Sequence, residues 1–292
     1  MTPLSPSVVA AIDDLELAAR VVVEGLRAGQ HRSPLHGYTA EFSQHRPYRT
    51  GDDLKYLDWK ILGRTDRLYS RQFREMTNMG VMLVVDASAS MAFPDRGVSK
   101  WQYVRVVAAA LAHLVSTAGD AVGLMTTSGE SLRYLPAKGG RMHLRALTSE
   151  LARLEPGGMW QPQRVLSRAA ELLSRRGLII ALSDFYDAED ETHRELRRAA
   201  TRGHDVAVLQ VVSPEEMTFP FNGDLDVEDL ESGSHQVIDG GEIRSRYRGA
   251  MADFLERCRS QARRAGLDYA LFTTDTPPER ALRQFLLRRQ GR

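Results

Sequence analysis

Two short runs of apolar residues, at positions 81–85 and 178–182, stand out in the hydrophobic pattern of the chain. Neither run contains a polar residue, which is typical of strands buried on both faces of a parallel sheet. Apolar residues at three- and four-residue spacing predict amphipathic helices around these runs. We expect helices at residues 7–28, 99–117, 141–154, 162–175, 189–202, 241–265 and 278–289, and further strands at 120–126, 131–135, 205–212 and 267–273.

The alternation of strands and helices from residue 81 onward predicts the fold class. Strands joined by helices form a mostly parallel sheet with helices on both faces, which is a doubly wound α/β fold. Six strands in the common Rossmann-type order 3-2-1-4-5-6 place the first and fourth strands side by side. The runs at 81–85 and 178–182 are the first and fourth strands, so we expect them to be adjacent, parallel and central.

Two segments lie outside this alternation and predict a small β-rich annex. Residues 41–76 include an alternating stretch at 67–75, and residues 227–231 and 235–238 flank a Ser-Gly-Ser turn that is typical of a β-hairpin. We expect residues 41–76 and 214–240 to pack together. We therefore assign residues 1–78 to an N-terminal helix and the annex segment, and residues 79–292 to the α/β domain, with a β-hairpin insertion at about 213–240.

Candidate chemistry follows the two buried strands. Asp86 ends the first strand, with Ser88 and Ser90 at alternate positions after it, and Ser183-Asp184 ends the fourth. Because ligands bind at the carboxyl ends of strands in open α/β sheets, we expect Asp86, Ser88, Ser90 and Asp184 to converge on one point. Carboxylate and hydroxyl oxygens suit Mg²⁺ or another small divalent cation. The structural alternative is that Asp86 closes the strand and the serines cap the loop or the next helix.

The composition of the chain argues against several classes of function. The formal net charge of +1 gives no general attraction for nucleic acid or for a membrane surface. The single cysteine, Cys258, excludes an internal disulfide and a thiolate metal cluster, and its helical context indicates a packed thiol. No apolar run reaches the length of a membrane span, and residues 1–6 lack the features of a signal peptide, so we expect a cytoplasmic location. The sequence contains no phosphate-binding P-loop motif.

The Asp86-x-Ser88-x-Ser90 loop and Ser183-Asp184 resemble the metal-ion-dependent adhesion site of von Willebrand factor A-type domains, over residues 81 to about 275. The preceding segment resembles the bacterial family known as domain of unknown function 58. The residues that carry this second resemblance are His36-Gly37, Glu41-Phe42, Arg46, Tyr48, Gly51-Asp52-Asp53, Asp58-Trp59, Leu68, Phe73 and Glu75. The resemblance implies a non-enzymatic protein-interaction module that acts with a MoxR-type AAA+ ATPase in assembling or remodelling unknown client proteins.

One position departs from the pattern of the superfamily. A threonine usually follows a Gly-Gly turn as a further ligand of the metal loop, but here Met159 and Trp160 follow Gly157-Gly158. The indole of tryptophan has only a donor and cannot ligate Mg²⁺. The resemblance therefore implies either a weak site that uses Gln161 or water in place of threonine, or a degenerate site.

Two other functions stay open at this point. A haloacid-dehalogenase-like phosphohydrolase also has an aspartate after its first buried strand, but it needs a second aspartate two residues later as general acid, where this chain has Ser88. A metal-free scaffold is the other alternative. Asp52, Asp53 and Asp58 lie among arginines and lysines, so we interpret them as caps and salt-bridge partners rather than as a second metal site.

Overall fold

The computed structural model describes residues 4–27, 42–47, 59–65, 68–73, 79–94, 96–129, 131–173, 176–186, 189–228, 230 and 234–290. The chain forms two compact units, one of residues 1–35 with 79–292 and the other of residues 36–78. The sequence-based division assigned the N-terminal helix to residues 1–78, whereas the structure groups this helix with the α/β unit. The Gly51-Asp52-Asp53 run, Asp58 and His36-Gly37 lie outside the described residues.

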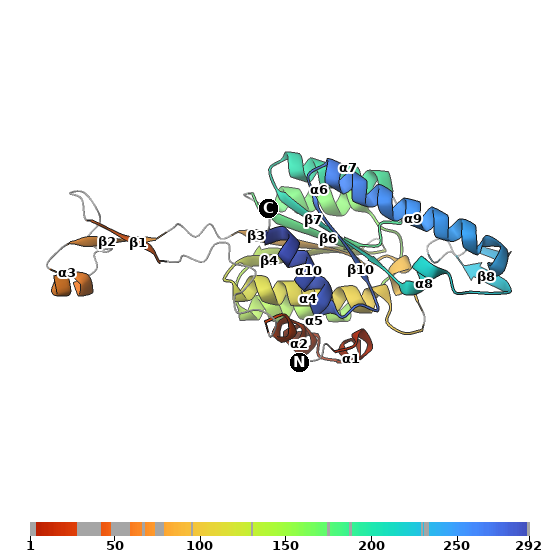
Figure 1. The fold of residues 1–292 in the computed structure, drawn as a ribbon, viewed down its shortest axis with the longest axis horizontal. Coiled ribbons are helices and arrows are strands. Elements are labelled where there is room, and N and C mark those ends of the chain that lie inside the picture. Colours follow the sequence, from red (N-terminus) through yellow and green to blue (C-terminus); the bar gives the residue numbers. More distant parts are fainter. Residues whose placement is uncertain are drawn as a thin grey trace. The chain divides into compact units, whose positions relative to one another are not determined.

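The α/β unit is built on a six-stranded sheet in the order β5-β4-β3-β6-β7-β10 (Figure 1). The strands are β3 (Gly80–Asp86), β4 (Ala121–Ser128), β5 (Ser131–Lys138), β6 (Leu178–Ser183), β7 (Asp205–Val212) and β10 (Asp268–Thr273). All neighbouring pairs are parallel except β4 and β5, which pair antiparallel. Numbered along the chain, these strands have the predicted order 3-2-1-4-5-6. The predicted fold class is confirmed, and β3 and β6 are the adjacent central strands.

Helices cover both faces of this sheet (Figure 1). One face packs against α4 (Lys100–Thr117), α5 (Arg141–Arg153) and α10 (Pro278–Gln290), and the other against α6 (Pro162–Leu172), α7 (Glu189–Thr201) and α9 (Gly240–Arg264). The N-terminal helices α1 (Pro6–Ala10) and α2 (Leu15–Arg27) pack on the outer side of α4. In β3, Leu83 and Val85 join the first hydrophobic cluster, and Met82 and Val84 join the second. The uninterrupted apolar run is therefore explained by burial on both faces of the sheet.

The helix expected at residues 7–28 is in fact two helices, so that prediction is wrong in detail. The chain leaves α1 after Ala10, and α2 begins after Asp14, whose Oδ1 accepts the backbone N–H groups of Glu16 and Leu17. An aspartate in this position caps the free N–H groups of a new helix. At its other end α2 packs against α10, where Arg283 donates to the carbonyl of Gly25 at 2.7 Å.

Four further strands form two separate antiparallel sheets. In the α/β unit, β8 (Asp224–Glu228) pairs with β9 (His235–Asp239) after the short helix α8 (Pro214–Thr218), which confirms the predicted hairpin. In the second unit, β1 (Phe42–Pro47) pairs with β2 (Tyr69–Phe73), and α3 (Trp59–Thr65) lies between them in sequence. Within the described residues β1 pairs only with β2 and β8 only with β9, and the packing of residues 41–76 with 214–240 stays a prediction.

Candidate functional site

The loop after β3 forms the first half of the site. Asp86 is the last residue of β3 and is only 1% exposed. Its Oδ1 accepts the backbone N–H of Ser88 at 2.8 Å, and its Oδ2 accepts the hydroxyl of Ser183 at 2.5 Å. The hydroxyl oxygens of Ser88 and Ser90 are 3.1 Å apart, and Ser90 is only half-buried. The neighbouring strands β3 and β6 therefore bring these groups together, as the strand order predicts.

Asp184 lies at the same edge of the sheet, but its carboxylate already has two partners. Its Oδ1 accepts the backbone N–H of Tyr186 at 3.1 Å, and its Oδ2 accepts a hydrogen bond from Lys100 Nζ at 2.6 Å. Lys100 begins α4 and is 1% exposed. Its ammonium also donates to Glu216 Oε1 at 2.5 Å and lies 4.7 Å from the ring centroid of Tyr186. The site thus contains a buried cation that sequence reasoning missed.

Glu216 is the second residue that sequence reasoning missed, and a local signal for it exists. The backbone N–H of Ser213 donates to Glu216 Oε2 at 2.7 Å, and Ser213 Oγ accepts the N–H of Glu216 at 3.2 Å. This capping box is the Ser-x-x-Glu pattern at the start of α8, and it can be read from the sequence. No comparable signal marks Lys100, because lysines at helix starts are almost always exposed.

Burial and neighbouring charges both shift the pKa values of the ionisable groups in the site. Burial and the nearby charge of Asp184 raise the pKa of Asp86 to about 7, although the hydrogen bonds from Ser183 and Ser88 oppose this rise. Burial opposes the charge of Lys100, but the attraction of Asp184 and Glu216 raises its pKa overall. Lys100 is therefore held in its charged form, whereas the carboxyl of Asp86 lacks a cationic partner among the described residues.

The turn that precedes Trp160 is held against the loop after β3. The N–H of Gly157 donates to the carbonyl of Ala87, and the carbonyl of Gly158 accepts the N–H of Ala89, both at 2.8 Å. Trp160 itself is buried, and its Nε1 donates to Thr192 Oγ1 of α7 at 3.1 Å. The tryptophan therefore packs in the core and brings no oxygen to the loop, while Met159 is 59% exposed beside it.

These contacts decide which groups fit a small hard cation. Asp86, Ser88 and Ser90 provide one carboxylate and two hydroxyl oxygens, which is a suitable donor set for Mg²⁺. Asp184 is a poorer ligand, because the ammonium of Lys100 is bonded to it and repels a second cation. The described residues contain no group of three or more His, Cys, Asp or Glu that could hold a metal, so such a site depends on the serines. That all four predicted residues bind a cation stays a prediction.

The strand order and the Asp-x-Ser-x-Ser loop at the carboxyl end of the first strand define a von Willebrand factor A-like domain. Within that class, a family model described as "Protein of unknown function DUF58" matches residues 44–257. The chain belongs to this DUF58 family, as the sequence resemblance indicated.

This chain is similar in sequence to a curated protein and in fold to two solved structures. An uncharacterized protein of Mycobacterium bovis is 31% identical over 231 residues, which cover 78% of this chain and 72% of the relative. The solved structure of the conserved hypothetical protein BatB from Bacteroides thetaiotaomicron has a TM-score of 0.50 at 19% identity and covers 73% of this chain and 98% of its own. An aerotolerance-related membrane protein from Bacteroides fragilis has a TM-score of 0.50 at 19% identity, with 72% and 99% covered. In the described part of this chain, no helix combines the length and apolar character that a membrane crossing requires.

Proposed function

We propose that this protein is a non-enzymatic protein-interaction module that binds its partner at the carboxyl edge of the sheet, around Asp86, Ser88 and Ser90. The observation that carries the proposal is the buried carboxylate of Asp86 beside two hydroxyl oxygens that are 3.1 Å apart, with Ser90 half-buried. A divalent cation held by these oxygens keeps an open position, which a carboxylate of a partner protein can occupy. The site then acts as a metal-dependent latch.

The charge balance of the buried cluster supports this proposal. Three carboxylates, of Asp86, Asp184 and Glu216, lie near the ammonium of Lys100, which pairs with Asp184 and Glu216 but not with Asp86. The formal charge of these four groups is minus two when all are ionised. A divalent cation neutralises this charge. Since Lys100 already neutralises one charge at Asp184, Asp86 is the main charged ligand, and the cation is bound weakly until a partner carboxylate completes its coordination.

The family resemblance supports a MoxR-type AAA+ ATPase as the partner and the assembly or remodelling of client proteins as the task. A cytoplasmic location suits such a partner. The exposed side chain of Met159 beside the loop adds an apolar contact at the edge of the proposed surface. A gene for such an ATPase next to the gene for this chain would support the pairing.

Metal binding is tested by calorimetric titration of Mg²⁺ into the full chain and two variants. Asp86→Asn keeps the shape of the side chain and removes its charge, and Asp253→Asn on the exposed side of α9 is the matched control. We expect the wild type and Asp253→Asn to bind with a Kd of about 10⁻⁴–10⁻³ M, and Asp86→Asn to show no binding. Equal heats for all three proteins would contradict a site at Asp86.

Partner binding is tested by surface plasmon resonance with the MoxR-type ATPase of the same genome, at constant Mg²⁺ so that the ATPase keeps its own nucleotide. We expect Asp86→Asn to weaken the affinity at least tenfold, because the latch loses its charged ligand. If the ATPase binds both proteins equally and no Mg²⁺ binds, the metal-free scaffold is the better description. If the ATPase does not bind the wild type, the proposed partner is wrong.

A further inference from the structure

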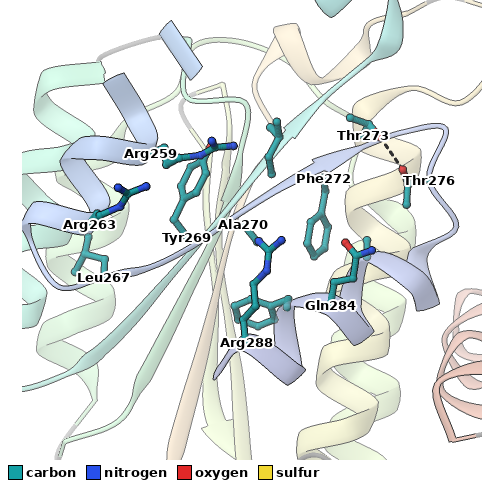
Figure 2. Close-up of a pocket in the computed structure, with 13 residues that line it drawn as sticks. Arg259, Arg263, Leu267, Tyr269, Ala270, Phe272, Thr273, Thr276, Gln284 and Arg288 are labelled. Carbon is teal, nitrogen blue, oxygen red and sulfur yellow. Dashed lines mark hydrogen bonds between the residues drawn. The ribbon is translucent and has the colours of Figure 1, made fainter. Parts of the chain in front are cut away.

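A groove of about 540 Å³ runs along the open edge of the main sheet, away from the loops of the candidate site. The strand β10 ends the sheet and pairs only with β7, so its other side has no neighbouring strand in the described chain. Figure 2 shows Arg259 and Arg263 reaching from α9 and Arg288 and Gln284 from α10 on either side of β10. The floor of the groove is the strand itself, from Tyr269 to Thr273.

The backbone of β10 presents unused hydrogen-bonding groups to this groove. The N–H of Thr274 donates to the carbonyl of Val212 in β7, and backbone groups alternate in direction along a strand. The backbone N–H and C=O groups of Ala270 and Phe272 therefore also point to β7. The same groups of Tyr269, Leu271 and Thr273 point to the open edge of the sheet. Of these, the Thr273 carbonyl accepts the N–H of Thr276, and the described chain supplies no backbone partner for Leu271. The unpaired backbone N–H and C=O groups of an edge strand can pair with one more strand.

The side chains around the groove favour a negatively charged ligand. Arg259, Arg263 and Arg288 are all exposed, and the residues that line the groove include no aspartate or glutamate. Arg259 has a surface ion pair with Glu256 at 3.5 Å, which contributes little in water. Neither Arg263 nor Arg288 has an ion pair within the described residues. Asp268, at the start of the strand, is already paired with Arg289 at 3.3 Å.

We propose that this groove binds an extended acidic segment of a partner protein, which adds to the sheet as a further strand beside β10. The peptide backbone pairs with the outward groups of Tyr269 and Leu271, as in other cases of strand addition. Side chains of an added strand alternate between the two faces, so its carboxylates meet Arg259 and Arg263 on the α9 side and Arg288 on the α10 side. The site is independent of the cation proposed at Asp86.

The probe for this site is a fluorescein-labelled peptide of repeated Glu-Glu-Val-Val, about eight residues long, which is within the usual length of a strand and places carboxylates on both faces of the added strand. Its binding to the full chain is followed by fluorescence anisotropy. The double variant Arg263→Glu/Arg288→Glu changes one arginine on each side of the groove. The matched control, Arg264→Glu/Arg280→Glu, makes the same change in net charge at exposed positions of α9 and α10 that do not line the groove.

We expect the groove variant to weaken binding at least tenfold, because two attractive pairs become repulsive, and the control to stay within about twofold of the wild type. A peptide methylated at every backbone nitrogen should not bind, and the unmodified peptide should slow hydrogen exchange at the N–H of Leu271. Thermal melts verify that both variants are folded. Equal loss in both variants, or unchanged binding of the methylated peptide, would overturn the proposal. So would a single-stranded oligonucleotide that binds more tightly than the peptide with the same arginine dependence.

Discussion

The ammonium of Lys100 lies 2.6 Å from the carboxylate of Asp184, and both side chains are almost fully buried. The lysine belongs to the first turn of α4 and the aspartate to the loop after β6, so the ion pair fixes a helix start to the edge of the sheet. Each charge of a buried ion pair needs the other, because removing one partner leaves the remaining charge buried without water or a counter-charge.

Lys100→Met tests this dependence. The variant keeps the length of the side chain and leaves Asp184 and Glu216 buried without their cation, so we expect a loss of about 3–5 kcal/mol in the free energy of unfolding. Urea denaturation followed by circular dichroism measures it. Lys138→Met, on the exposed edge strand β5, should change stability by less than about 0.5 kcal/mol. Equal stability of the two variants would show that the ammonium is dispensable.

Thr192→Val tests why tryptophan occupies position 160. The valine is nearly isosteric but leaves the buried indole N–H of Trp160 without its acceptor, so we expect a cost of about 1–3 kcal/mol. Thr201→Val at the exposed end of α7 is the control, and the comparison uses the same denaturation curves. If both variants unfold at the same urea concentration, the hydrogen bond does not hold Trp160 in the core.

Two glycine substitutions should have opposite effects. Gly158 has a φ of +69°, and a Cβ there would collide with the backbone of Gly129, so Gly158→Ala should destabilise the protein by at least about 1–3 kcal/mol. Gly249 lies in the exposed middle of α9 with open space around it, so Gly249→Ala should stabilise it by about 0.5–1 kcal/mol. Differential scanning calorimetry gives both signs. A raised Tm for Gly158→Ala would contradict the tight approach of the two turns.

The reaction rate of the buried Cys258 thiol measures how often the core around α9 opens to solvent. Burial, followed by the nearby charge of Glu189, raises its pKa to about 12, so the thiol stays protonated throughout the neutral range. Because only the thiolate reacts, a disulfide reagent at about pH 8 should label the native protein slowly and the denatured protein at once. Rapid stoichiometric labelling of the native chain would mean that this part of the core opens easily.

The parts of the fold that the sequence predicted are those determined by local patterns. Apolar runs without polar residues identified β3 and β6, and the strand order then placed Asp86 beside Ser183 before any contact was known. Lys100 and Glu216 could not be paired in this way. They are 116 residues apart, and nothing local distinguishes a lysine that is buried by a distant carboxylate from one that faces solvent.

Other differences arise where local and tertiary preferences compete. Apolar spacing continued across residues 11–14 and predicted one helix, but the Asp14 carboxylate offers the backbone a new helix start. The family resemblance placed Trp160 near a ligand position, but its large apolar indole is buried in the core.

The contact between Arg283 and Gly25 has a consequence for the time course of folding. The two residues are 258 positions apart, and α2 packs both against α4 and against α10, the helix that carries Arg283. During synthesis, α2 can pack against α4 early, but the part of α2 that packs against α10 has no partner until more than two hundred further residues are translated. Folds with such distant pairings form slowly, and their early segments are exposed to aggregation. We expect the nascent chain to stay bound to chaperones until α10 has left the ribosome.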